Sequence, residues 1–376
     1  MMNDADKTTF FYILQQGLWQ RSFDHLPDTQ TDWESIYRMS IRQTVSGIMF
    51  DGLANLPVDL QPDKTLLRQW YARTIKIEQA NLLLNSVLSE ITNIYKNNGL
   101  HPILLKGQGL AQNYHNPLHR QCGDIDLYFG KENYKKANDI AFSLGIQNVE
   151  KRSRHLSFSY KNIVIENHRV IIQLHNPLYT TRLNKIINKY FPHRIQSIAI
   201  NEDHVSIPDK QFNVLYVFLH LSIHYLGIGV GLRQLCDWAQ VLHVHNDIDR
   251  DILLEDLNNL GFLDMWIVFG YIVVNNLGLP KEFMPFYDEN ASDKARRVLS
   301  QIMYDGNFGV YSYASQHRLS FVRKWYTFMY ILKRSLMYNF IFPKKIFLYT
   351  IFQTVDLVID VLRYAPTKIA QRFRLK

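Results

Sequence analysis

The sequence predicts an α+β protein in which a small mixed sheet lies between an N-terminal and a C-terminal helical region. Apolar residues recur at helical spacing up to residue 95, and short apolar or period-two runs replace them between residues 102 and 166. Helical spacing returns from residue 209. Because the sheet has only four or five expected strands, we expect the helices to pack against it.

The N-terminal region, residues 1–95, is expected to be helical. Residues 33–53 and 66–95 both carry apolar side chains at a spacing close to 3.6 residues. The Asn-Asn-Gly run at 97–99 ends the second helix, because Asn and Gly tolerate the left-handed backbone of a helix cap.

The central region, residues 96–205, is expected to alternate short strands and helices. The expected strands are 102–105, 125–129, 155–160 and 163–166, and the expected helices are 108–114 and 132–144. Residues 161–162 make the turn of a hairpin, and residues 170–174 are a candidate continuation of it. The C-terminal region, residues 206–376, is expected to be helical, with breaks near residues 227–231 and at Pro280, Pro285 and Pro343.

The charge of the chain is unevenly distributed. The 376 residues include 42 Lys and Arg against 34 Asp and Glu, with 47% hydrophobic residues, which excludes a disordered chain. Residues 318–376 hold 12 of the basic residues and only Asp356 and Asp360 as acids, so the rest of the chain is close to neutral. Nucleic-acid binding is therefore not expected. The basic C-terminal helices could pack on the core, contact a partner protein or lie peripherally on a membrane.

The chain is expected to be cytoplasmic. Cys122 and Cys236 lie too far apart to form a disulfide framework, and the first 20 residues lack the features of a signal peptide. No run of about 18 uncharged apolar residues occurs, so we expect no transmembrane segment.

Asp124 and Asp126 are the most informative residues. They alternate with apolar residues on the expected strand 125–129, so their side chains point to the same face, about 7 Å apart along the backbone. Two converging carboxylates repel each other, unless a divalent cation lies between them. Upstream, Gly107 lets the backbone approach a ligand closely, and the helix that begins at Gln108 offers free amides to a phosphate.

These residues form part of a longer string with a Leu-Lys-Gly turn and an Asp-Ile-Asp-Leu strand. The string resembles an uncharacterised bacterial nucleotidyltransferase family of the polymerase β-like nucleotidyltransferase superfamily. The resembling positions are Leu105, Lys106, Gly107, Leu110, Ala111, Tyr114, Pro117, Arg120, Asp124, Ile125, Asp126 and Leu127. Residues 220, 224 and 231–238 of the C-terminal region fit the same family.

The resemblance implies that an acceptor attacks the α-phosphorus of a nucleoside triphosphate and releases pyrophosphate. It also implies that Asp124 and Asp126 hold Mg²⁺ (or Mn²⁺), with a third carboxylate on a neighbouring strand. Lys106 and Arg120 would neutralise phosphate oxygens, although Arg120 could instead pair with one of the aspartates.

Two stretches compete for the third carboxylate. Glu166-Asn167-His168 keeps an acid and lies on the second arm of the hairpin, so we favour it, with Glu166 as metal ligand or base. Gln173-Leu174-His175 has Gln where the acid is required, and would leave only two carboxylates. His168 could contact phosphate or acceptor, or be structural.

The C-terminal region adds two pairs of residues at helical spacing. His220 and His224 could ligate a metal, but no third ligand accompanies them, so we interpret them as packing or pocket residues. Arg233 and Asp237 are expected to form an ion pair with each other or between helices.

The sequence therefore predicts a metal-dependent nucleotidyltransferase whose acceptor, a small molecule, sugar or protein, is not identified. The alternatives are a catalytically impaired nucleotide-binding or scaffold protein with the same fold, and a toxin-like transferase that acts on tRNA or protein.

Overall fold

The computed structural model begins with four helices. It describes residues 2–21, 31–151, 154–172, 174, 177–191, 194–227, 229–307 and 329. The helices are α1 (Asp4–Trp19), α2 (Trp33–Arg42), α3 (Ser46–Ala54) and α4 (Lys64–Asn97). Residues 33–53 thus form two helices instead of the expected one, because Thr44 adopts a left-handed conformation (φ 56°) between them.

Helix α4 has clear signals at both ends. The Asp63 side chain accepts hydrogen bonds from the backbone N–H groups of Thr65 and Leu66, which caps the N-terminus. Gly99 follows the helix with φ 71°, as the Asn-Asn-Gly run predicted.

The central region forms one mixed seven-stranded sheet. Its strands are β1 (Ile103–Leu104), β2 (Asp124–Tyr128), β3 (Gln147–Lys151), β4 (His155–Tyr160), β5 (Ile163–His168), β6 (Ile195–Ile200) and β7 (Asp203–Pro208). They are arranged in the order β3-β4-β5-β2-β1-β7-β6. The pairs β2–β5 and β1–β7 are parallel, and the other neighbours are antiparallel.

The expectation of four or five strands was wrong because it missed β3, β6 and β7. Every residue of β3 is exposed, so no apolar alternation marks it as a strand. The hairpin of β6 and β7 joins the other edge of the sheet through β7. Residues 171, 172 and 174 are buried but are not part of a strand, so the hairpin does not continue through them.

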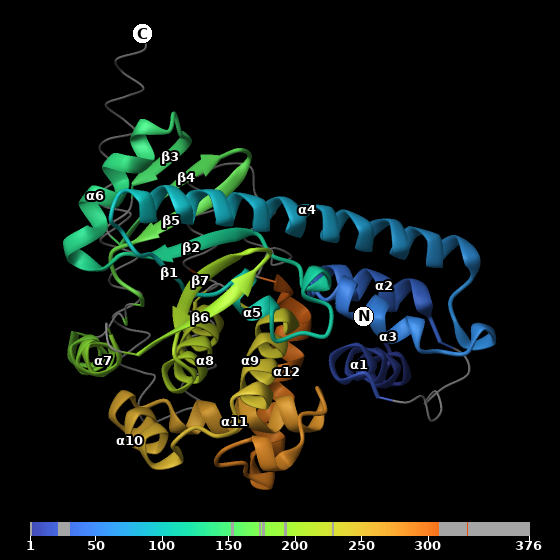
Figure 1. The fold of residues 1–376 in the computed structure, drawn as a ribbon. Helices are drawn as coiled ribbons and strands as arrows, with labels where there is room; N and C mark the ends of the chain where they lie inside the picture. Colours follow the sequence, from blue (N-terminus) through green and yellow to red (C-terminus); the bar gives the residue numbers. More distant parts are fainter. Residues whose placement is uncertain are drawn as a thin grey trace.

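The remaining helices surround this sheet. They are α5 (Gln108–Ala111), α6 (Gly130–Ser143), α7 (Pro177–Tyr190), α8 (Lys210–Leu226), α9 (Leu232–Val244), α10 (Arg250–Leu260), α11 (Leu263–Asn275) and α12 (Ser292–Asp305), with short 3-10 turns at Val58–Leu60, Pro117–His119, Lys281–Phe283 and Glu289–Ala291. Helix α4 crosses one face of the sheet, while α8 and α9 lie on the other side (Figure 1). The sheet is therefore covered by helices from both flanking regions, as the sequence predicted.

Two apolar clusters hold the layers together. One lies between the sheet and the helices α4 and α6, and contains Leu88, Ile91, Ile125 and Leu127. The larger cluster joins α1 and α3 to the C-terminal helices. Leu105 and Leu110 of the central region are buried in the same cluster. Burial of this kind is the main favourable contribution to folding, and here it spans all three regions.

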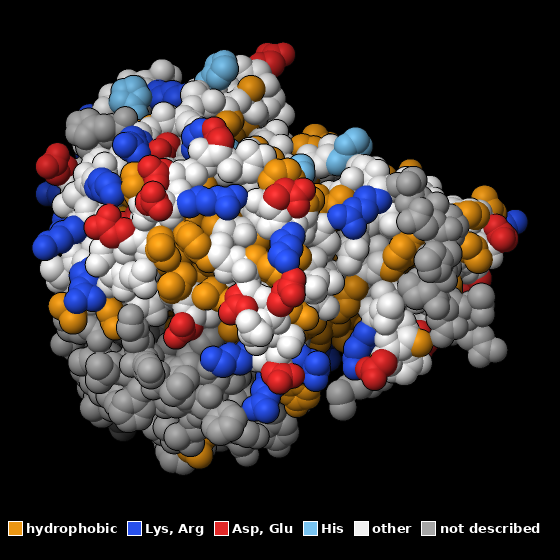
Figure 2. Space-filling model, turned by 90° about the horizontal axis from the view of Figure 1, so that it is seen from below, with side chains coloured by type: hydrophobic (Ala, Val, Ile, Leu, Met, Phe, Trp, Pro, Cys, Tyr) orange, Lys and Arg blue, Asp and Glu red, His pale blue; other side chains and the backbone are white. Residues whose placement is uncertain are grey.

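One face of the described part carries mixed charge. Lys and Arg side chains are interspersed with Asp and Glu side chains over the face shown in Figure 2. None of the described helices combines the length and the apolar character that a membrane span requires. The basic segment 318–376, for which core, partner and membrane contacts were all considered, lies outside the described residues except for residue 329.

Candidate active site

Parallel pairing of β2 and β5 brings three carboxylates together. Asp126 lies opposite Glu166 in the register, and Asp124 lies two residues earlier on β2. One oxygen from each of the three side chains lies within 4.8 Å of the others. Ile125 lies between the two aspartates in sequence and Leu127 follows the second. Both side chains point into the apolar cluster under α4. The period-two pattern thus places the apolar and acidic side chains of β2 on opposite faces.

Of the two candidates for the third carboxylate, Glu166 is the one found in this cluster. Gln173 and His175, which belong to the competing stretch, lie outside the described residues.

Lys106 follows β1 and points at the two aspartates. Its Nζ lies 3.0 Å from Oδ2 of Asp126 and 3.8 Å from Oδ2 of Asp124. Although burial disfavours the charged amine, the two carboxylates raise the Lys106 pKa above its usual value. The lysine therefore carries a charge that partly offsets the aspartates.

His168, at the end of β5, contacts Asp126 and Glu166. Its Nε2 lies 2.9 Å from Oδ1 of Asp126 and 3.3 Å from Oε2 of Glu166. Burial lowers the pKa of His168, but these hydrogen bonds and charges outweigh burial and raise it to about 9. His155, opposite His168 in the β4–β5 register, lies 3.6 Å from Oε1 of Glu166. His155, Glu166 and His168 thus form a second set of metal-ligating atoms that shares Glu166 with the first.

The carboxylates differ in how easily they ionise. Repulsion from Asp126 raises the pKa of Asp124. Burial opposes ionisation of Asp126, yet Lys106 and His168 lower its pKa below the usual range. Glu166 has a lowered pKa as well, because the hydrogen bond from His168 outweighs its burial. Charge repulsion is therefore concentrated on Asp124, which is the most exposed of the three.

Gly107 lies where no larger residue fits without strain. It has φ 64°, and a Cβ at this position would lie 3.2 Å from Sγ of Cys122 and 3.3 Å from the carbonyl oxygen of Asp124. The backbone here thus runs close to the start of β2. The neighbouring Gln108 does not point into the site, since its Nε2 donates to Oδ1 of Asn81 on α4 (3.0 Å).

Arg120 was expected near phosphate or the two aspartates, and the structure places it in another ion pair. Its Nε and Nη2 donate to both oxygens of Asp237 on α9, at 2.8 and 2.7 Å, and both side chains are buried. Tyr114 donates its hydroxyl to the same carboxylate (2.8 Å). Burial disfavours the charge of Asp237, but Arg120 outweighs burial and lowers its pKa.

The expected ion pair between Arg233 and Asp237 is not formed, because Asp237 accepts from Arg120 and Tyr114. Arg233 instead donates Nη1 to the carbonyl oxygen of Gln121 (2.6 Å).

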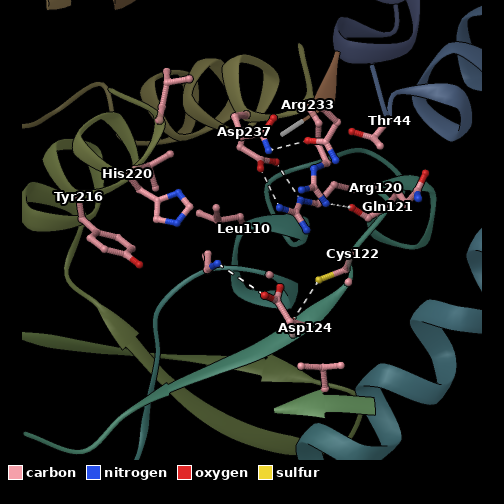
Figure 3. A pocket seen from close by; sticks show the side chains of 18 residues that line it. Thr44, Leu110, Arg120, Gln121, Cys122, Asp124, Tyr216, His220, Arg233 and Asp237 are labelled. Atoms are coloured by element: carbon pink, nitrogen blue, oxygen red, sulfur yellow. Dashed lines mark hydrogen bonds and ion pairs between the residues drawn. The ribbon is translucent and has the colours of Figure 1, made fainter. Parts of the chain in front are cut away.

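A cavity of about 360 Å³ opens beside the carboxylates. Lys106 and Gly107, which follow β1, line it together with Asp124 of β2. Tyr216, His220 and Arg233 line it from α8 and α9, opposite Asp124 (Figure 3). The other lining residues are Thr44, Leu110, Arg120, Gln121, Cys122, Gly123, Val164, Val217, Leu221, Gln234, Asp237 and Asn307. The C-terminal helical region therefore forms part of the site.

His220 and His224 lie one turn apart on α8, with their Nε2 atoms 3.2 Å apart. Burial lowers the pKa of both, to about 4 for His224, so both rings are neutral at pH 7. Among the described residues, no group of three metal-ligating side chains includes either histidine. His220 lines the cavity and His224 contacts His220 from the next turn of α8, which agrees with the interpretation as packing or pocket residues.

Sequence reasoning missed the buried His119. Its Nδ1 lies 2.6 Å from Oδ1 of Asp51 on α3, and its Nε2 lies 2.8 Å from Oε1 of Glu78 on α4. This arrangement fixes the 3-10 turn that precedes Arg120. Asp51 and Glu78 lie 27 positions apart on separate helices, so no local pattern indicated the contact.

Comparison with known families gives the geometry a context. A model of a family described as an uncharacterised nucleotidyltransferase matches residues 29–277, which is more than half of the chain. The chain belongs to this nucleotidyltransferase family. No curated protein and no solved structure matches it.

Membership of the nucleotidyltransferase family supports a general role in nucleotidyl transfer. It also agrees with the mixed α/β fold and the helical flanks described above. The matched span includes β1 to β7 and helices α2 to α11 up to residue 277, so both sides of the cavity belong to it.

Proposed function

We propose that this protein is a metal-dependent nucleotidyltransferase that moves a nucleoside monophosphate from a nucleoside triphosphate to an acceptor hydroxyl on a small molecule, a sugar or a protein. The observation that supports this most strongly is the cluster of Asp124, Asp126 and Glu166 on two parallel strands. The oxygen of the acceptor hydroxyl would attack the α-phosphorus, its proton would pass to a base, for which Glu166 is the candidate, and the bond to the leaving pyrophosphate would break.

The donor set fits a hard divalent cation. Three carboxylates within 4.8 Å repel one another, as the raised pKa of Asp124 shows, and carboxylate oxygens are the ligands that Mg²⁺ and Mn²⁺ prefer. Asp124, Asp126 and Glu166 would hold the ion. The ion would supply Lewis-acid stabilisation of the phosphate charge.

The protein's own residues would position the nucleotide. Lys106 lies beside the aspartates and would offset phosphate charge as a point cation. Gly107 lets the turn that follows Lys106 pack closely against the start of β2, which would keep Lys106 beside the aspartates. His168 would orient Asp126 and Glu166 through its contacts with both. Gln108 would act on the site only through its backbone, because its side chain is bound to α4.

The alternative of a catalytically impaired scaffold depends on the site having only two carboxylates. Glu166 lies within side-chain reach of Asp124 and Asp126, which supports the catalytic proposal over the scaffold.

A thermal-shift titration tests the proposal. ATP, GTP, CTP and UTP are added to the full chain with and without Mg²⁺ or Mn²⁺, because a ligand that binds the native state raises its apparent stability. We expect at least one triphosphate to raise the melting temperature of the wild type only when metal is present. The Asp124→Asn, Asp126→Asn double variant should lose that shift. An equal shift in both proteins, or none with any nucleotide, would overturn the proposal.

A further inference from the structure

Three basic side chains line the cavity, and two of them have carboxylate partners. Lys106 pairs with Asp126, and Arg120 makes a two-bond ion pair with Asp237. Arg233 has no carboxylate within ion-pair distance among the described residues. Of the three basic side chains that line the cavity, Arg233 is therefore the one that is not in an ion pair with a described carboxylate.

The bonds of Arg233 leave part of its guanidinium unused. Nη1 donates to the carbonyl oxygen of Gln121 (2.6 Å), while Nε is buried without an acceptor in the described part of the chain. Asp237, one helical turn away, already accepts from Arg120 and Tyr114.

An unpaired guanidinium in this position is unfavourable in the free protein. Burial and the neighbouring Arg120 both lower the pKa of Arg233, yet a guanidinium stays protonated in proteins. The Arg233 side chain is half-buried and its Nε is buried, and charges shielded from water in this way are normally paired in native proteins, because leaving water without a counter-charge is unfavourable. A bound anion would supply the missing partner.

The position of Arg233 indicates where such an anion would lie. Arg233 lines the cavity from α9, and Asp124 lines it from the sheet side (Figure 3). Lys106 lines the same cavity. At about 360 Å³ the cavity is within the size range of small-molecule sites. One ligand can therefore contact Arg233 while its reacting group lies beside Asp124.

We propose that Arg233 binds a phosphoryl group of the substrate. The group belongs either to the terminal phosphates of the nucleoside triphosphate or to a phosphorylated acceptor. This inference rests on the proposed function and extends it, because it makes the C-terminal helices a substrate-recognition surface.

The test measures binding of inorganic pyrophosphate and inorganic phosphate to the metal-free full chain by calorimetry. We expect the wild type to bind at least one of them. Arg233→Gln should weaken binding roughly 10- to 100-fold, as loss of a hydrogen bond to a charged group would. Arg233→Lys should recover part of the affinity. Arg296→Gln is the matched control, because Arg296 is an exposed arginine on α12 and should leave binding unchanged.

A second arm separates the two sources of the phosphate. Nucleoside triphosphates and monophosphates are titrated with Mn²⁺ present. If Arg233 holds the terminal phosphates, Arg233→Gln weakens the triphosphate and leaves the monophosphate unchanged. If it holds an acceptor phosphate, the variant weakens inorganic phosphate and leaves the triphosphate unchanged.

The proposal is overturned if the wild type binds neither anion, or if wild type and Arg233→Gln bind both anions equally. Failure here is distinct from failure of the proposed function. The metal-free anion titration depends on Arg233, whereas the metal-dependent nucleotide shift depends on Asp124 and Asp126.

Discussion

The ionised carboxylate of Asp124 lowers the stability of the folded, metal-free protein. Its carboxylate faces Asp126 and Glu166, and repulsion raises its pKa. Lys106 offsets only part of that repulsion. Active-site residues commonly stabilise the folded protein less than a substitution that abolishes activity would.

Replacing Asp124 by Asn should therefore stabilise the metal-free protein. The amide keeps the shape of the side chain and removes one of three neighbouring negative charges. We expect a higher melting temperature for Asp124→Asn without metal, together with loss of metal-dependent nucleotide binding. Thermal unfolding in a chelator checks the first effect, and a lower melting temperature than that of the wild type would contradict it.

His119 should make stability depend on pH. Burial lowers its pKa, but the contacts with Asp51 and Glu78 outweigh burial and raise it above 6.5. A raised folded-state pKa stabilises the protein fully below the unfolded pKa of about 6.5, and the contribution is lost as pH rises through the folded value.

The free energy of unfolding in urea, measured from pH 6 to pH 9 for wild type and His119→Gln, tests this. The difference between the two proteins should be largest at pH 6 and shrink as pH rises. A difference that stays constant would show that His119 does not titrate in the folded protein over this range.

At the scale of elements, α4 connects the N-terminal helices to the site. Asn81 donates Nδ2 to the carbonyl oxygens of Leu118 (2.6 Å) and Arg120 (2.9 Å), and its Oδ1 accepts from Gln108. One side chain of the helix thus fixes both segments that flank the cavity.

Asn81→Leu should destabilise the protein by about 1–3 kcal/mol, because it leaves buried carbonyl groups unpaired. The adjacent Leu82→Ala is a suitable control, since Leu82 is 52% exposed and its replacement should change stability by no more than about 0.5 kcal/mol. Urea unfolding of both variants gives the comparison. Equal losses would mean that the bonds of Asn81 are not the cause.

These elements also show what the sequence could predict. Strand β2 and helix α4 carry strong local patterns, and both were expected within two residues of their bounds. Strand β3 is exposed throughout and gave no signal. The parallel register that places Glu166 opposite Asp126 joins segments 40 positions apart. The sequence could therefore favour Glu166 as the third carboxylate, but it could not predict its position relative to the aspartates. The bond from Arg120 to Asp237 links residues still further apart.

For the whole molecule, the main consequence is that the three expected regions meet in shared cores and in one cavity. The division at residues 95 and 205 remains a prediction about the chain, although α8 and α9 line the cavity together with β2. The Arg120–Asp237 pair joins the central region to the C-terminal helices. The net charge of +8 belongs mainly to residues beyond 317, and the site itself is close to balanced.

The two partners of that pair should differ in importance. Removing one partner of a buried ion pair typically costs about 3–5 kcal/mol. Asp237→Asn leaves Arg120 without its carboxylate, as Arg233 already is, whereas Arg120→Gln frees Asp237 to pair with Arg233 one turn away. We expect Asp237→Asn to be the more destabilising variant, and urea unfolding measures both. The opposite order would contradict this account of the buried charges.

The most direct test of the central claim is Mn²⁺ binding to the full chain, followed by the loss of the free-ion electron paramagnetic resonance signal. We predict that the wild type binds Mn²⁺ and binds it more tightly with a nucleoside triphosphate present. The Asp124→Asn, Asp126→Asn double variant, shown to be folded by circular dichroism, should leave the ion free. Equal Mn²⁺ binding by both proteins would contradict the assignment of these carboxylates as the metal site.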